Sequence, residues 1–228
     1  MGIHFERPIN EQPFTKDGKA LGSFSRELDI PIYHWGGFLV EEKLKQKKER
    51  NLEILKKVVE SGKDDEAIHF LLGMNYRDLT MYDEAINEFE KVVKLSPKGK
   101  FAIPAREEIA WIHFRQKKIK EANYEAIEIF KLDPQSATAM NIIGSVFAAM
   151  GEEEKAIDAF KSASEVPIKE DAVIVNLRQR DYISNLFLSR AYLKTGKKTE
   201  AYEAAQKAYN FDPTDEAKEA MECKFFPI

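Results

Sequence analysis

The stretch "EAIHFLLGMNYRDLTMYDEAINEFEKVVKLSP", residues 66–97, decides the fold of this chain. It contains a small residue, an aromatic residue, an alanine, a phenylalanine and a proline at regular separations. Twelve residues separate the small residue from the alanine, four more lead to the phenylalanine, and eight more lead to the proline. These five positions are Gly73, Tyr76, Ala85, Phe89 and Pro97.

The same spacing recurs three more times downstream, and the interval of twelve residues is kept in every copy. A repeated unit of this length indicates an array of stacked units, and the alternative is an ordinary helical bundle with a coincidental spacing. The second copy contains Ala110, His113, Ala122, Ala126 and Pro134; the third contains Gly144, Phe147, Ala156, Phe160 and Pro167, the last one position early; the fourth contains Ser189, Tyr192, Ala201, Ala205 and Pro213.

Each position of the repeat has a physical role in a pair of packed helices. The small residue allows the first helix to approach its neighbour closely, and the large residue fills the adjoining space. The proline ends the second helix, because it cannot continue the hydrogen-bond ladder. Gly151 and Gly196 predict tight turns inside the third and fourth pairs. Since no pair can bury its apolar stripe alone, neighbouring pairs are expected to stack.

This pattern resembles the tetratricopeptide repeat, and the resemblance covers about residues 66–215. It departs from the family at several positions: no tryptophan opens a repeat, His113 replaces an aromatic residue, and Ala126 and Ala205 replace phenylalanine. The resemblance implies an all-α superhelix of about four helix pairs with flanking helices and a short irregular or β segment at the N-terminus.

The expected organisation follows from these boundaries. Residues 1–40 form a strand and turn segment, residues 41–62 an amphipathic helix, residues 63–215 the repeats and residues 216–228 a capping helix with an apolar tail. The leading helix presents Leu44, Leu52, Leu55 and Val59 to the first repeat. The expected repeats are 66–99, 103–136, 137–170 and 171–215, the last beginning with an elongated helix from about residue 170 to 195.

Composition argues against several classes of partner. The formal net charge is −4, which gives no general reason to expect nucleic acid or an anionic membrane. The apolar runs are too short to span a bilayer, and the first residues lack the apolar stretch of a secretory signal. The single cysteine, Cys223, excludes an intrachain disulfide and suggests a cytoplasmic location.

The first forty residues resemble the end of the catalytic domain in family 2 glycosyltransferases that carry tetratricopeptide repeats. The matching pieces are Asn10-Glu11-Gln12, "KDGK" at residues 16–19 and Ile32-Tyr33-His34-Trp35-Gly36, followed by a basic helix. The resemblance implies that Glu11 is a candidate base and that His34 helps to hold a metal. Because the chain lacks a nucleotide-binding half and an Asp-x-Asp pair, both residues are expected to be relics or structural polar groups.

The sequence predicts no catalytic site of its own, no cofactor and no metal site. The four histidines lack metal-ligand spacing, and His69 and His113 fall at packing positions of the repeats. The basic cluster at residues 43–50 is interspersed with glutamates, which favours a solvated helix face over a phosphate-binding patch.

The first helices of such repeats line a concave groove, and the residues next to their packing positions are predicted to point into it. Aromatic residues and arginine dominate binding hot spots, so this groove is the candidate binding site. Alternatively, the first forty residues or the C-terminal "KFFPI" fill it within the same molecule. The predicted residues are Phe70, Met74, Arg77, Glu107, Trp111, Phe114, Asn141, Ser145, Ala148, Leu186, Arg190 and Leu193.

The leading hypothesis is a cytoplasmic scaffold that binds a helix or an extended peptide in this groove, with Arg77 and Arg190 as polar anchors. Homo-oligomers are also expected as a possibility, through the apolar tail of Phe225, Phe226 and Ile228. The rival hypothesis is an acceptor-presenting module of a glycosyltransferase whose catalytic half lies outside this sequence.

Overall fold

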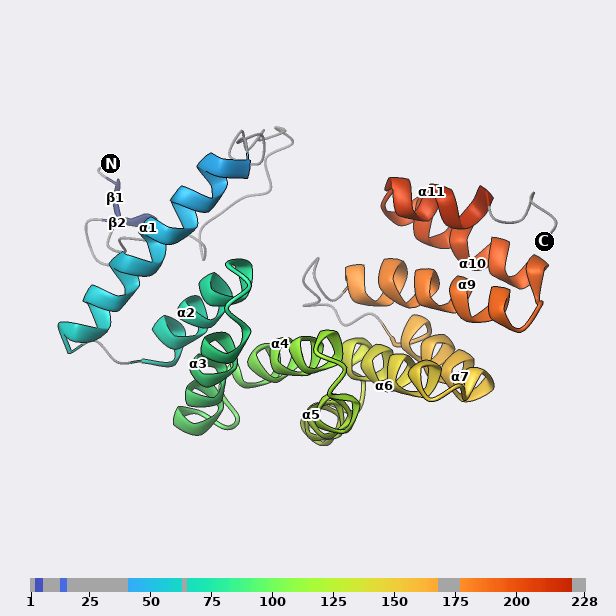
Figure 1. Cartoon of the computed structure of the whole chain (residues 1–228), viewed down its shortest axis with the longest axis horizontal. Coiled ribbons are helices and arrows are strands. Elements are labelled where there is room, and N and C mark those ends of the chain that lie inside the picture. The colour runs from blue at the N-terminus through green and yellow to red at the C-terminus, as the bar shows by residue number, and fades with distance from the viewer. Residues whose placement is uncertain (1–2, 6–12, 16–40, 63–64, 168–176, 223–228) are drawn as a thin grey trace. The chain divides into compact units, whose positions relative to one another are not determined.

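The computed structural model describes residues 3–5, 13–15, 41–62, 65–167 and 177–222 (Figure 1). The chain divides into two compact units. The first unit, residues 1–95, contains β1 (Ile3–Phe5), β2 (Pro13–Thr15), α1 (Glu41–Glu60), α2 (Glu66–Asp78) and α3 (Tyr82–Leu95). The second unit, residues 96–228, contains α4 (Ala102–Arg115), α5 (Ile119–Leu132), α6 (Ala137–Ala149), α7 (Glu153–Ser164), η3 (Arg178–Ile183), α9 (Ser184–Lys194), α10 (Lys198–Phe211) and α11 (Asp215–Glu222).

The first unit combines a short strand pair with three helices. β1 and β2 pair antiparallel, with Ile3 opposite Thr15. In α1, Leu52 and Leu55 are buried, which follows from the amphipathic pattern of this helix, and α1 packs on α2. The side chain of Leu44 lies outside the described residues.

Four helix pairs follow the predicted repeat, and the predicted fold class is confirmed. Within the first unit α2 packs against α3, and within the second α4 packs against α5, α6 against α7 and α9 against α10. In the second unit the second helix of one pair also packs on the first helix of the next, α5 on α6 and α7 on α9. This arrangement of stacked pairs is that of a tetratricopeptide-type α-α fold.

The small and large residues of the repeat are paired by volume within each helix pair. A methyl group added at Gly73 would lie 2.6 Å from the ring of Phe89, and one added at Gly144 would lie 2.5 Å from the ring of Phe160. Phenylalanine therefore occurs where the facing residue is glycine. In the other two repeats the same two positions hold small residues, Ala110 with Ala126 and Ser189 with Ala205.

The turn inside each pair uses one residue with positive φ at the same position of the repeat. Gly151 and Gly196 have φ values of 80° and 77°, which agrees with the tight turns predicted for them. In the first two repeats the position is held by Thr80 and Lys117, both at φ 60°. The position is therefore a property of the helix pair, and a glycine is not required there.

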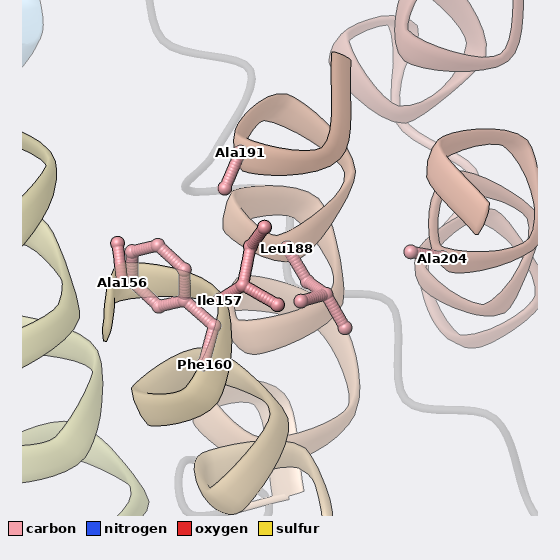
Figure 2. Close-up of a cluster of buried hydrophobic side chains, with 6 residues drawn as sticks. All are labelled: Ala156, Ile157, Phe160, Leu188, Ala191 and Ala204. Carbon is pink, nitrogen blue, oxygen red and sulfur yellow. The ribbon is translucent and has the colours of Figure 1, made fainter. Parts of the chain in front are cut away.

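A hydrophobic core lies between the third and fourth helix pairs, next to the pocket described below. Figure 2 shows Ile157 and Phe160 of α7 and Leu188 of α9 in one buried cluster, together with Ala156, Ala191 and Ala204. The alanines keep the helices close, and Phe160 occupies the space left by Gly144.

The elongated helix predicted at residues 170–195 is described only from residue 177, since residues 168–176 lie outside the described residues. The described part is helical to Lys194, but its first turns, Arg178–Ile183, form a π-helix. The carbonyl oxygen of Gln179 accepts hydrogen bonds from the Ser184 hydroxyl (2.8 Å) and from the Asn141 amide (3.0 Å). The widened turn thus places this carbonyl against α6, which the helical periodicity did not predict.

Candidate functional site: an aromatic pocket in the second unit

A pocket of about 320 Å³ lies in the second unit, among the ends of α4, α6 and α9 and the start of α7. Three first helices of successive repeats therefore contribute to it, as the repeat pattern predicts for a binding surface. Its lining consists of Phe114, Ser145, Ala148, Ala149, Glu153, Phe160, Phe187, Arg190, Ala191 and Lys194.

Aromatic rings form a continuous wall beside the pocket. Trp111 packs edge-on against Phe114 of the same helix, with ring centroids 6.0 Å apart and planes at 87°. Trp111 also contacts Phe187 of α9 at 6.1 Å, and Phe187 in turn contacts Phe160 of α7 at 5.4 Å. These edge-to-face and tilted contacts fix the rings relative to one another, so the wall is pre-formed.

Small side chains form the floor of the pocket, and this accounts for its volume. Ala148 and Ala149 end α6, and Ala191 lies on α9. The hydroxyl of Ser145 donates a 2.8 Å hydrogen bond to the carbonyl oxygen of Asn141, so this polar group is already satisfied within its own helix. The floor is therefore apolar in character.

The charged residues of the pocket are engaged in ion pairs. Lys194 lies 2.9 Å from Glu153, and Arg190 lies 2.5 Å from Glu216 of α11. The side chains of Lys194 and Arg190 are 59% and 51% exposed, so both pairs lie at the solvent edge of the pocket. Because each cation has an acidic partner, the rim carries little net charge.

Glu107 occupies the turn of α4 before Trp111, and its carboxyl group is directed at α6. Burial raises the pKa of Glu107 to about 7; the Thr138 hydroxyl opposes this through a hydrogen bond, while the negative charges of Glu108 and Asp133 add to it. Glu107 therefore joins two first helices, α4 and α6, through its contact with Thr138, and its carboxyl group titrates near neutral pH.

The predicted groove residues divide according to their place in the repeat. Phe114, Ser145, Ala148 and Arg190 line the pocket, and Trp111 forms its wall. Two predictions are wrong: Asn141 and Leu186 are 0% and 1% exposed. Each lies three residues before the small residue of its repeat, and at this position the side chain is covered by a following helix. Asn141 contacts Gln179 of η3, and Leu186 packs in a cluster with Tyr182 and Ala217.

The remaining predicted residues do not line the pocket. Leu193 is half-buried on α9. In the first unit, Phe70 packs at 5.7 Å from Phe89, Met74 is half-buried, and the Arg77 guanidinium donates to Asp78 at 2.7 Å. These three residues belong to a different unit from the pocket, so one groove along all four repeats stays a prediction.

The groove prediction did not include six of the lining residues, which are Ala149, Glu153, Phe160, Phe187, Ala191 and Lys194. Phe187 lies one turn before Arg190 on the same helix, and an aromatic residue three positions before a predicted groove residue was the available signal. Glu153 is the first residue of α7 and Lys194 is the last residue of α9. At these helix ends the repeat pattern does not predict where a side chain points.

The other candidate sites receive no support from the described residues. Among them, no cluster of three or more His, Cys, Asp or Glu residues could hold a metal ion. No helix in the described ranges is long and apolar enough to cross a membrane. Glu11 and His34 lie outside the described residues, and the resemblance to a glycosyltransferase stays a prediction.

Two family profiles, both described as tetratricopeptide repeat, match residues 66–98 and 183–215. These segments contain the first helix pair, α2 and α3, and the fourth, α9 and α10. These two segments of the chain are therefore similar to the tetratricopeptide repeat. No curated protein matches the chain.

Solved structures of similar fold include TTC0263, a tetratricopeptide protein of Thermus thermophilus, at 18% identity and a TM-score of 0.59, covering 81% of this chain and 93% of that one. MamA is similar at 21% identity and a TM-score of 0.55, covering 80% and 97%. YrrB, described as a tetratricopeptide protein with an unusual peptide-binding site, has 19% identity and a TM-score of 0.51, covering 79% and 85%. At these identities the likeness concerns the fold.

Proposed function

We propose that this chain is a protein-interaction scaffold that binds a peptide or protein segment in the aromatic pocket of its second unit. The carrying observation is the wall of Trp111, Phe114 and Phe187 beside a floor of small side chains. Pre-formed apolar pockets bounded by rigid aromatic residues are typical of sites that anchor a partner's side chain. The peptide-binding site named for YrrB supports this use of the fold.

The proposal places binding on the protein surface and assigns no catalytic residues. The pocket is large enough for one or two side chains, so the ligand would be a short segment that inserts apolar groups. The ion pairs at the rim, Arg190 with Glu216 and Lys194 with Glu153, would orient the rest of the segment. The single cysteine fits a reducing compartment, and we place the protein in the cytoplasm as part of the proposal.

Charging the floor of the pocket tests the proposal. Peptides are first selected on the full chain from a randomised display library, and their affinities are then measured by fluorescence anisotropy. Ala148→Glu should weaken binding by about 2 kcal/mol or more, because it places a carboxylate among apolar contacts. Trp111→Ala should cause a similar loss by removing the aromatic wall.

The matched control is Met150→Glu, which adds the same charge two residues away at an exposed position that does not line the pocket. It should leave affinity within about threefold, since surface changes away from a contact have small effects. Circular dichroism melting checks that each variant is folded. Selected peptides that bind Ala148→Glu and Trp111→Ala as well as the parent would remove the pocket from the proposal.

A further inference from the structure

We propose that the pocket is occupied by the chain's own C-terminal segment, with Phe225 and Phe226 as the inserted side chains, and that an external partner must displace it. This inference rests on the proposed function, because it concerns the same pocket. The segment after α11 reads "CKFFPI", and so a strongly polar helix is followed by two phenylalanines, a proline and an isoleucine. An aromatic pair of this kind matches the chemistry of the wall formed by Trp111, Phe114 and Phe187.

The position of α11 brings the start of this segment close to the pocket. Glu216, in the first turn of α11, lies 2.5 Å from Arg190, which lines the pocket. Ala217 of the same helix is fully buried in a cluster with Tyr182 and Leu186. The hydroxyl of Tyr182 also meets the Thr214 hydroxyl at 2.7 Å, at the entrance to α11. α11 is therefore fixed on the helix that forms one side of the pocket.

The length of chain is sufficient to return to the pocket. Glu222 comes six positions after Glu216 along the helix, which corresponds to about 9 Å. The three or four residues that follow can span about 10–14 Å when extended. Phe225 and Phe226 can therefore come back to the level of Arg190, and Pro227 favours an extended backbone in the residue before it.

The charges of the pocket favour an apolar occupant over an acidic one. Arg190 and Lys194 are paired with Glu216 and Glu153, so an acidic ligand would have to replace existing partners. An apolar occupant leaves both pairs in place. The segment from residue 225 onward contains only apolar side chains, which agrees with this condition.

The chain supplies its own reporter for the test. Cys223 is the only cysteine and precedes the two phenylalanines, so it can carry a bimane fluorophore, which nearby tryptophan quenches on contact. The background is Trp35→Phe, which leaves Trp111 as the single tryptophan. We expect quenched bimane in this full-length protein. Trp111→Phe and the double variant Phe225→Ser/Phe226→Ser should each restore its intensity.

Concentration distinguishes the possible occupants. Quenching that is unchanged on dilution supports occupation within one molecule, whereas quenching that disappears on dilution assigns the pocket to a second copy and overturns the proposal. Bimane intensity that stays the same when Trp111→Phe is added to the Trp35→Phe background also overturns it. Circular dichroism melting confirms that the labelled variants are folded.

A competition measurement provides the second arm. A fluorescein-labelled "KFFPI" peptide should bind the full chain carrying Phe225→Ser/Phe226→Ser about tenfold more tightly than the parent. In the parent the tethered segment competes with the peptide at an effective concentration of about 1 mM, and for a segment Kd of about 0.1 mM this competition weakens the peptide about tenfold. Equal affinity for both chains overturns the proposal. If library-selected peptides bind the pocket while this peptide does not, the scaffold function stands and only the self-occupation fails.

Discussion

At the scale of single residues, polar pairs that are buried or partly buried distinguish the first two repeats from the last two. His69 of α2 lies 2.5 Å from Glu88 of α3, and Arg106 of α4 lies 2.6 Å from Glu125 of α5. In each pair the two partners are nineteen residues apart in the sequence, and both pairs occupy the same two positions of the repeat. The matching positions of the third repeat hold Met140 and Ala159, and those of the fourth hold Asn185 and Ala204.

These pairs show a limit of the sequence reasoning. His69 was predicted to be a packing residue, and it is buried, but its partner Glu88 was not foreseen. Glutamate is usually solvated on a helix surface, so it stands out in the sequence only when the register of the repeat is applied to both helices at once. Removing one partner would take a short hydrogen bond from the other, which makes such pairs costly to break, even though Lys91 also lies 2.8 Å from Glu88.

Glu107 predicts a dependence of stability on pH. Its pKa of about 7 in the fold lies above the ordinary value of 4.5, so between these values the folded state binds more protons than the unfolded chain. The contribution of Glu107 is therefore most favourable below pH 4.5 and is lost as pH rises through 7. The loss amounts to about 3 kcal/mol at most.

Urea unfolding of the parent and of Glu107→Gln at pH 5, 6, 7 and 8 measures this contribution. Glutamine keeps the size of the side chain and its hydrogen bonding to Thr138 but carries no charge. The stability of the variant relative to the parent should therefore rise from pH 5 to about pH 7 and level off by pH 8. Glu121→Gln, on the exposed side of α5, is the control and should show a flat difference. A flat difference for Glu107→Gln as well would show that its carboxyl group is solvated.

At the scale of the helix pair, the volumes of two residues sixteen positions apart are coupled. Gly144→Ala places a methyl group 2.5 Å from a ring carbon of Phe160 and should destabilise the fold by about 1–3 kcal/mol. Phe160→Ala leaves a cavity and should cost about 3–5 kcal/mol. The double variant recreates the pair formed by Ala110 and Ala126, so its cost should fall below the sum of the two.

A double-mutant cycle from urea denaturation measures that coupling, which we expect to be about 1–3 kcal/mol in favour of the double variant. Ala110→Gly is the matched control, because Ala126 already leaves room for the Ala110 methyl group; its effect should combine helix propensity with the loss of one buried methyl group, at about 1–2 kcal/mol. Strict additivity of Gly144→Ala and Phe160→Ala would refute the volume pairing.

The helix pairs were predictable from the sequence because their spacing is short-range and periodic. The turn glycines at 151 and 196 were predicted from the same repeat spacing. Thr80 and Lys117 occupy the equivalent position, also with positive φ. The π-helix was not predictable, because nothing in the periodicity of residues 178–183 distinguishes it from an α-helix. It depends on the Gln179 carbonyl meeting Asn141 of another helix.

The candidate site was predictable only in part, and the reason is geometric. The rule of choosing residues beside each packing position selected Phe114, Ser145 and Arg190, which line the pocket, and their role in binding a partner stays a prediction. It failed at Asn141 and Leu186, because side chains one turn earlier are covered by the next element of the stack. Which neighbour covers a turn depends on how the repeats stack, and this information is not contained in one repeat.

At the scale of the whole molecule, we expect each substitution to destabilise mainly the helices next to it in the repeat array. Within the second unit each helix pair packs mainly on the pairs beside it, so the loss of one pair is expected to be transmitted only over a short distance. Phe89 in the first unit and Phe160 in the second occupy the same repeat position, and both are buried against a glycine. They form a matched pair of probes for the two units.

Hydrogen exchange should therefore respond locally to each substitution. Phe89→Ala should lower amide protection in α2 and α3 and leave α9 and α10 close to the parent, because the packing it removes lies within the first pair. Phe160→Ala should lower protection in α6, α7 and α9, whose side chains share its buried cluster, and leave α2 and α3 unchanged. If either substitution lowered protection equally throughout the described helices, the chain would unfold as one cooperative unit, and a ligand bound in the pocket would then stabilise the first unit as strongly as the second.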